Sequence, residues 1–300
     1  MSESLLRRLL AGAVDYAGLF PPAALDMPAA VGEFAGHLAG PDAWAMGRFV
    51  VPVARLAELE EAVEAPAPRV PAEAWRLSAL VGADAAADLR SLGEFNCRHA
   101  VPGAPALSGD VIEARAGSVE AIDRLLGALP RWATAYVEIP LDRDPSPLVA
   151  AIARHGARAK ARTGGVTADA IPAAGDLLRF LRACTAARIP FKATAGLHHP
   201  LRAEYALTYA PDSARAAMFG YLNVFLAAAW LRQGLGDADA LGLLEERSPE
   251  AFVFGDEAIE WRGHRLERAA LLEARGSAIV SFGSCSFTEP VEELRALAPV

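Results

Sequence analysis

The sequence contains very little lysine. Of its 29 basic residues in 300, only Lys160 and Lys192 are lysines, and the other 27 are arginines. This excess of arginine, with abundant alanine and proline, is typical of a GC-rich coding bias and indicates nothing about function. Under that bias, the informative feature is where the two lysines lie.

Positive charge is also scarce, since the formal net charge is −8 and the isoelectric point lies near 5.4. A protein that binds the nucleic-acid backbone presents a basic face, so we expect no nucleic-acid partner. Cysteine occurs three times, as Cys97, Cys184 and Cys285, without a CxxC spacing. That pattern excludes a disulfide framework and a zinc knuckle. Because Cys285 has no base beside it in the sequence, we do not expect a nucleophilic thiol there.

Long apolar segments are missing as well. The longest run, Ala216–Leu231, is shorter than the roughly 20 residues that span a bilayer, and it contains Asn223. We therefore expect a buried helix and no membrane partner. The first 20 residues contain no apolar segment behind a basic start, so we expect no signal peptide and a cytoplasmic protein.

The sequence does contain a regular pattern in which short apolar segments alternate with amphipathic ones. Eight strands are predicted, at Ala13–Leu19, Arg48–Val53, Arg76–Val81, Val111–Arg115, Thr134–Ile139, Arg158–Arg162, Pro190–Thr194 and Ala278–Phe282. Helices are predicted between Asp26 and Gly40 and at Ala54–Val63, Asp84–Leu92, Ser118–Leu126, Pro145–His155, Ala174–Ala187, Asp212–Gln233 and Val291–Leu297. Such alternation, in a chain somewhat longer than the typical 250 residues or so, predicts a single (β/α)8 barrel domain over residues 1–300.

An insertion is predicted at residues 236–276, between the seventh and eighth strands, where this alternating pattern is interrupted. It contains Phe252–Gly263, which predicts a β-hairpin with Gly255 and Asp256 at its turn. A second count makes Phe252–Phe254 a barrel strand and removes Ala13–Leu19 from the barrel. Both counts keep the α/β class.

The two lysines fall on neighbouring predicted strands. Period-two alternation puts Lys160 on one face of the sixth strand with Arg158 and Arg162, and Lys192 on one face of the seventh with Thr194. Two nearby ammonium groups in a partly dry barrel would lower each other's pKa by repulsion and desolvation. A lysine so affected is partly neutral near pH 7 and can form a Schiff base with a carbonyl compound.

The segments Lys160-Ala-Arg-Thr-Gly-Gly and Lys192-Ala-Thr-Ala-Gly resemble the paired lysine strands of the deoxyribose-phosphate aldolases and related class I aldolases. The resemblance implies that Lys160 forms the Schiff base and that Lys192, on the next strand, tunes it. That family places the pair on strands six and seven and transfers protons with an aspartate on an earlier strand. Here the candidates for that step are Glu113 and Glu138, while the insertion has no counterpart in the compact aldolases.

Further polar residues follow the predicted strands, where barrel enzymes place their active groups. Asp15 and Tyr16 lie toward the end of the first predicted strand, where they form a structural turn or reach the barrel mouth. A lid is expected around Tyr205, Tyr209 and Arg215. The turn at Gly283–Ser286 suits an anion such as phosphate or carboxylate, or a plain tight turn. The expected substrate-binding residues are Arg115, Arg162, Thr163, Gly164, Thr194, His198, His199, Ser281, Gly283 and Ser284.

Three functions follow from these residues. The first is a lyase or aldolase that acts on a small, oxygenated, anionic carbonyl compound through a Schiff base and needs no cofactor. The second is a lyase, isomerase or hydrolase assisted by a divalent metal ion that His198 or His199 binds together with Glu138. The third is a non-catalytic barrel that binds a metabolite through both lysines. The apolar composition also indicates a possible homo-oligomer.

Overall fold

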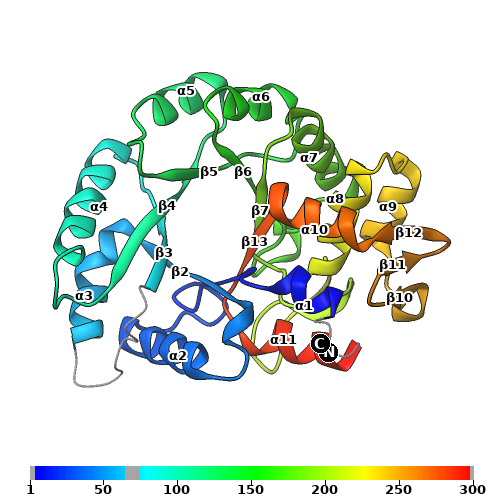
Figure 1. Ribbon diagram of the computed structural model, residues 1–300, viewed down its shortest axis with the longest axis horizontal. Helices are drawn as coiled ribbons and strands as arrows, with labels where there is room; N and C mark the ends of the chain where they lie inside the picture. Colours follow the sequence, from blue (N-terminus) through cyan, green and yellow to red (C-terminus); the bar gives the residue numbers. More distant parts are fainter. Residues whose placement is uncertain (1–3, 65–74, 298–300) are drawn as a thin grey trace.

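A computed structural model describes residues 4–64 and 75–297 and shows eight parallel strands closed into a barrel (Figure 1). The predicted (β/α)8 barrel is therefore confirmed. Ala13–Leu19 supplies the first strand, so the count that used Phe252–Phe254 is wrong. The strands, in order around the barrel, are β1 (Val14–Tyr16), β2 (Met46–Pro52), β3 (Trp75–Leu80), β4 (Leu107–Arg115), β5 (Thr134–Glu138), β6 (Arg158–Arg162), β7 (Phe191–Thr194) and β13 (Ile279–Ser284), which pairs with β1.

Helices surround the barrel where the apolar periodicity places them. Three of these helices begin with a side-chain cap, since the side chains of Asp26, Asp84 and Ser118 each accept a backbone N–H at a helix start. The surrounding helices are α2 (Met27–Ala39), α3 (Leu56–Glu64), α4 (Ala85–His99), α5 (Val119–Gly127), α6 (Ser146–Arg154), α7 (Ala174–Ala187), α8 (Tyr221–Arg232) and α11 (Thr288–Leu297). Short 3-10 helices occupy Ala43–Ala45, Val53–Arg55, Ala168–Ala170 and Pro249–Ala251.

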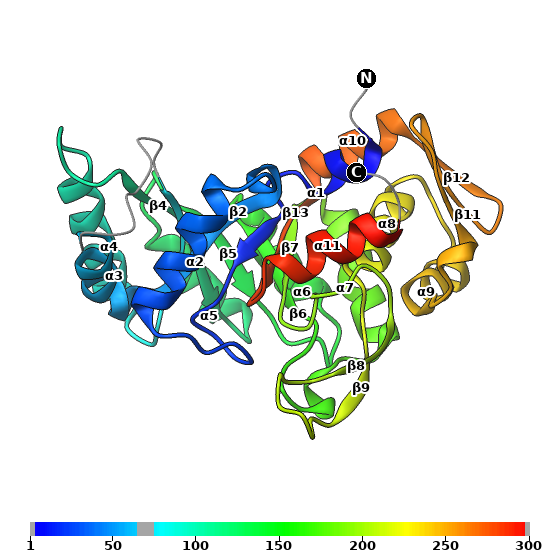
Figure 2. The ribbon, with the colours of Figure 1, turned by 90° about the horizontal axis from the view of Figure 1, so that it is seen from below.

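The helix predicted over Asp212–Gln233 starts nine residues later, at Tyr221. The preceding residues form an antiparallel pair of strands, β8 (Ala203–Ala206) and β9 (Arg215–Met218), which projects beyond the carboxyl ends of the barrel strands (Figure 2). The alanines of β9 favour a helix locally, but pairing with β8 outweighs that weak preference. Gly220, in an extended conformation, separates β9 from α8.

The insertion between β7 and β13 lies at one side of the barrel (Figure 1). It consists of α9 (Asp237–Glu245), a three-stranded sheet and α10 (Arg268–Ser277); the sheet strands are β10 (Phe252–Phe254), β11 (Ala258–Trp261) and β12 (His264–Glu267). The predicted hairpin is β10–β11, in which the Gly255 amide donates to the Ala258 carbonyl, while β12 was not predicted. Asn223 of α8 is fully buried, and its side-chain amide donates to the carbonyls of Leu243 and Glu246. These hydrogen bonds join the insertion to the barrel.

A short helix that the sequence did not predict, α1 (Leu5–Leu10), precedes β1 and packs beside α10 at the end of the barrel opposite β8 and β9 (Figure 2). Its four leucines are all buried. No helix within residues 4–64 and 75–297 is long and apolar enough to cross a membrane.

Candidate active site

Both lysines lie on the inner face of the barrel. Strand register pairs Lys160 of β6 directly with Lys192 of β7, while Ala159 and Ala161 face outward into the helix layer. Only 5% of Lys160 and 1% of Lys192 is exposed. Lysines are among the residues that are least often fully buried, so the barrel must supply each of them with a counter-charge.

Three carboxylates supply it, and the five side chains form an alternating chain of charges. Asp15 Oδ2 lies 2.6 Å from Lys192 Nζ, which lies 2.5 Å from Glu113 Oε1. The second oxygen of Glu113 lies 2.7 Å from Lys160 Nζ, and Lys160 in turn lies 2.8 Å from Glu138 Oε2. Each lysine thus bridges two carboxylates, and Glu113 bridges the two lysines.

Hydrogen bonds fix the inner part of this chain. Ser281 Oγ donates to Asp15 Oδ2 at 2.7 Å, and the Arg48 amide donates to Asp15 Oδ1 at 2.9 Å. Ser78 Oγ donates to Glu113 Oε1 at 2.6 Å. These bonds come from three further strands, so the position of the charge chain is determined by the barrel as a whole.

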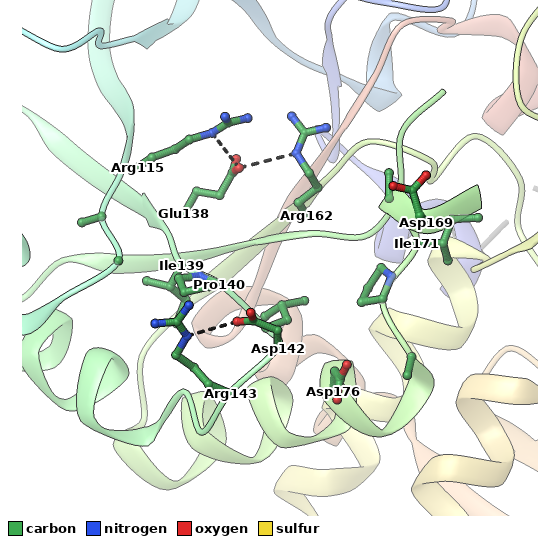
Figure 3. Close-up of a pocket in the computed structure, with 16 residues that line it drawn as sticks. Arg115, Glu138, Ile139, Pro140, Asp142, Arg143, Arg162, Asp169, Ile171 and Asp176 are labelled. Carbon is green, nitrogen blue, oxygen red and sulfur yellow. Dashed lines mark hydrogen bonds and ion pairs between the residues drawn. The ribbon is translucent and has the colours of Figure 1, made fainter. Parts of the chain in front are cut away.

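At its outer end this chain of charges reaches Arg115 and Arg162. Arg115 Nε lies 2.9 Å and Arg162 Nε 3.5 Å from the same oxygen of Glu138 (Figure 3). The Arg115 side chain is 71% and the Arg162 side chain 43% exposed, so much of each guanidinium faces solvent. A planar guanidinium of this kind suits a carboxylate or phosphate.

The charges of this chain control one another's ionisation. Burial opposes ionisation of Glu113, but the charges of Lys192 and Lys160 outweigh it and hold the pKa of Glu113 well below its ordinary value. Burial likewise opposes a charged Lys192, but the charges of Asp15 and Glu113 raise its pKa above the ordinary value. The expectation that repulsion between the lysines lowers their pKa is therefore wrong for Lys192, because a carboxylate lies between the two ammonium groups.

A cavity of about 690 Å³ opens over this chain at the carboxyl ends of the strands. Its lining includes both lysines, Glu113, Glu138, Arg115 and Arg162, together with Thr194, His198, Gly283 and Cys285. A second hollow of about 770 Å³ adjoins it and shares Arg115, Glu138 and Arg162 (Figure 3). The Arg–Glu–Arg cluster therefore lies between the lysine cavity and the outer hollow.

Five residues that were expected to bind substrate have other partners and do not line the cavity. Thr163 Oγ1 donates to the Ala195 carbonyl, and Gly164 packs against Gly196. Ser281 holds Asp15, while Ser284 Oγ lies 3.2 Å from His198 Nδ1. His199 lines a small neighbouring pocket together with His198; its Nδ1 lies 2.8 Å from Glu293 and its ring stacks on Tyr205.

The contacts of Asp15 and Ser78 with the lysine–carboxylate cluster, and the contact of Cys285 with His198, were not predicted from the sequence. For Asp15 and Ser78 the available signal was a polar residue at an inward position of an otherwise apolar strand. The alternation of inward and outward side chains along the strand could have revealed it. Nothing in the sequence links Cys285 to a base, whereas the fold brings its Sγ to 3.9 Å from His198 Nε2.

The proposed metal site of Glu138 with a histidine is not assembled in the structure, since Glu138 binds cations and the histidines contact Glu289 and Glu293. Within residues 4–64 and 75–297 no group of three or more histidine, cysteine or acidic side chains is arranged to hold a metal ion.

In comparisons with known proteins, no family model, curated protein or solved structure matches the chain.

Proposed function

We propose that the protein is a lyase of the aldolase type that forms a Schiff base between Lys160 and a small carbonyl compound carrying a carboxylate or phosphate. One observation carries the proposal. The two lysines of the chain lie side by side inside the barrel, joined by one carboxylate, at the inner end of a cavity that opens where barrel enzymes place their chemistry.

Lys160 is the better nucleophile of the two. Lys192 is fixed by Asp15 and Glu113, and its raised pKa keeps it charged. Lys160 lies nearer the arginines, and Glu113 and Glu138 accept its hydrogen bonds at 2.7 and 2.8 Å. Either carboxylate is close enough to take a proton from the ammonium group, which must become neutral before it attacks a carbonyl carbon.

The same carboxylate can complete the imine. After attack, the carbinolamine loses its hydroxyl as water when Glu138 or Glu113 returns the proton, and the positively charged iminium then withdraws electrons from the adjacent carbon–carbon bond. Arg115 and Arg162, with much of their side chains exposed at the cavity, would hold the anionic group of the substrate.

The test is to trap the imine. The protein is incubated with acetaldehyde, pyruvate, dihydroxyacetone phosphate and related carbonyl compounds, reduced with borohydride, and digested for peptide mass spectrometry. We expect one adduct, on the peptide that contains Lys160. The adduct should be absent in Lys160→Arg, which keeps the positive charge, and present in Lys192→Arg. An adduct on Lys192 alone, or none with any compound, would contradict the proposal.

One observation favours a second candidate. Each lysine bridges two carboxylates and is held by ion pairs on both sides, which suits a barrel that binds an anionic metabolite without chemistry. Calorimetric binding of the same compounds without a trappable adduct would support this second candidate over the first.

A further inference from the structure

A cysteine, a histidine and a glutamate lie in a row at the wall of the same cavity. His198 follows β7, Cys285 follows β13, and Glu289 lies in the first turn of α11. The thiol Sγ is 3.9 Å from His198 Nε2, and His198 Nδ1 is 3.1 Å from Glu289 Oε2. Cys285 and His198 both line the cavity, so a small molecule that enters it can reach the thiol.

Neighbouring groups fix this row. Tyr209, on the connection between β8 and β9, has its hydroxyl 3.6 Å from Cys285 Sγ and 3.3 Å from Glu289. The Ala23 backbone N–H also donates to the thiol. Ser284 Oγ, at the carboxyl end of the neighbouring strand β13, lies 3.2 Å from His198 Nδ1 and restrains the imidazole ring. A histidine held through Nδ1 presents Nε2 to the cysteine, which is the orientation a general base requires.

The surroundings also favour the charged thiolate and imidazolium. Burial alone would lower the pKa of His198, but hydrogen bonds with Cys285 and Glu289 raise it to about 9. Burial alone would raise the pKa of Cys285, but the hydrogen bond and charge of His198 lower it on balance. A thiolate, not a thiol, is the nucleophile in cysteine chemistry.

We propose that Cys285, His198 and Glu289 form a nucleophile–base–carboxylate triad that takes an acyl group from a small ester or thioester and transfers it to water. This activity is separate from the imine at Lys160. It uses different residues of the same cavity, and neither reaction requires the other.

The reaction needs only the ester and water. Sγ forms a bond to the acyl carbon, and the carbonyl electron pair moves to oxygen. When the carbonyl re-forms, the bond to the alcohol or thiol breaks, and that group takes the proton from His198 Nε2. Water then attacks the acyl-cysteine while Nε2 takes its proton, and the sulfur leaves as thiolate. Nothing is oxidised or reduced.

The experiment uses the full chain and p-nitrophenyl acetate as the probe. We expect a burst of about one nitrophenolate per chain, with the acetyl group mapped to the Cys285 peptide. Exposed Cys97 and buried Cys184 are controls within the same molecule. Removing the base in His198→Gln should slow acetylation of Cys285 by about a hundredfold, since general base catalysis contributes at least that much. Glu289→Gln should also slow it, whereas Glu293→Gln, which removes the carboxylate that faces His199, should not.

A second measurement needs no variant. The rate of alkylation by iodoacetamide should rise at a lower pH for Cys285 than for Cys97. The titratable groups that face the thiol are His198, Tyr209 and, from β1, Tyr16, with Glu289 behind the histidine. The proposal is overturned if Cys285 is acetylated no faster than Cys97, or if His198→Gln acetylates at the wild-type rate. Because this product is on cysteine rather than lysine, its absence leaves the imine proposal unaffected.

Discussion

At the scale of single residues, Glu113 is the carboxylate that links the two lysines. It is 3% exposed and receives bonds from Lys160, Lys192 and Ser78. A buried ion pair is not necessarily stabilising compared with apolar residues, but the loss of one partner leaves an uncompensated buried charge. Glu113 therefore contributes to the stability of the barrel interior and to keeping Lys192 charged.

Glu113→Gln should lower the free energy of unfolding by about 3–5 kcal/mol, because both lysines lose a shared counter-charge. Urea denaturation near neutral pH measures this change. Glu58→Gln is the matched control, since Glu58 pairs with Arg55 at the surface and its loss should have no measurable effect. A loss of stability as small as that of the control would contradict the role assigned to Glu113.

The charge of Glu113 also predicts how the free energy of unfolding depends on pH. Because its folded-state pKa lies below the ordinary value of 4.5, Glu113 stabilises the wild type fully above that pH, and this stabilisation is lost as the pH falls toward the folded-state value. Glutamine does not titrate, so the stabilities of variant and wild type should converge in acid. If the difference in stability between variant and wild type stays constant as the pH falls, the charge of Glu113 does not contribute to stability.

At the scale of elements, the ends of β6 and β7 explain the glycines of the two lysine segments. A Cβ atom on Gly164 would lie 3.1 Å from the Cα of Gly196, and Gly196 itself has a φ of +73°. The two backbones approach each other where the strands end. Gly164 was expected to bind substrate, but its contacts show that it allows this close approach.

Gly164→Ala should destabilise the protein by about 1–3 kcal/mol, because the backbone of Gly196 must move to admit the methyl group. Gly36→Ala, in the middle of α2 with open space around it, should instead stabilise it by about 0.5–1 kcal/mol. Thermal unfolding of the two variants measures both signs. If both alanines stabilise, the contact between the strand ends is not restrictive.

The elements themselves were largely predictable. Each predicted barrel strand overlaps an observed one, and α7 has the predicted bounds, because burial imposes a clear apolar period on them. The predictions failed at β8–β9 and did not include β12, α1, α9 or α10, all of which lie outside the repeating units. Pairing with distant partners decides their structure, so local sequence carries little signal for them.

At the scale of the whole molecule, Arg275 of α10 joins the segment before β1 to the start of β13. Its guanidinium donates to the carbonyls of Leu9 and Ala11, which precede β1, and of Ile279, which begins β13. The barrel closes where β1 pairs with β13, so Arg275 supports the closing seam.

Arg275→Ala should lower the free energy of unfolding by about 1.5–3 kcal/mol, because it removes charge-assisted hydrogen bonds to carbonyls near the seam. Arg265→Ala is the control, since Arg265 pairs with Glu260 and Glu267 on the exposed face of the insertion. Urea denaturation and hydrogen exchange of the β1 amides measure the effect. Equal stability of both variants would show that the seam does not depend on Arg275.

The sequence by itself determined the class of fold and the inward direction of both lysines, because strand–helix alternation and period-two alternation are local properties. It could not determine what the lysines contact. Asp15, Glu113 and Glu138 come from three different strands, and only barrel closure brings them within hydrogen-bonding distance of Lys160 and Lys192. The same closure brings His198 to Cys285, 87 residues apart in the chain. Charge pairing depends on distances in space, so tertiary structure decided the chemistry of the cavity.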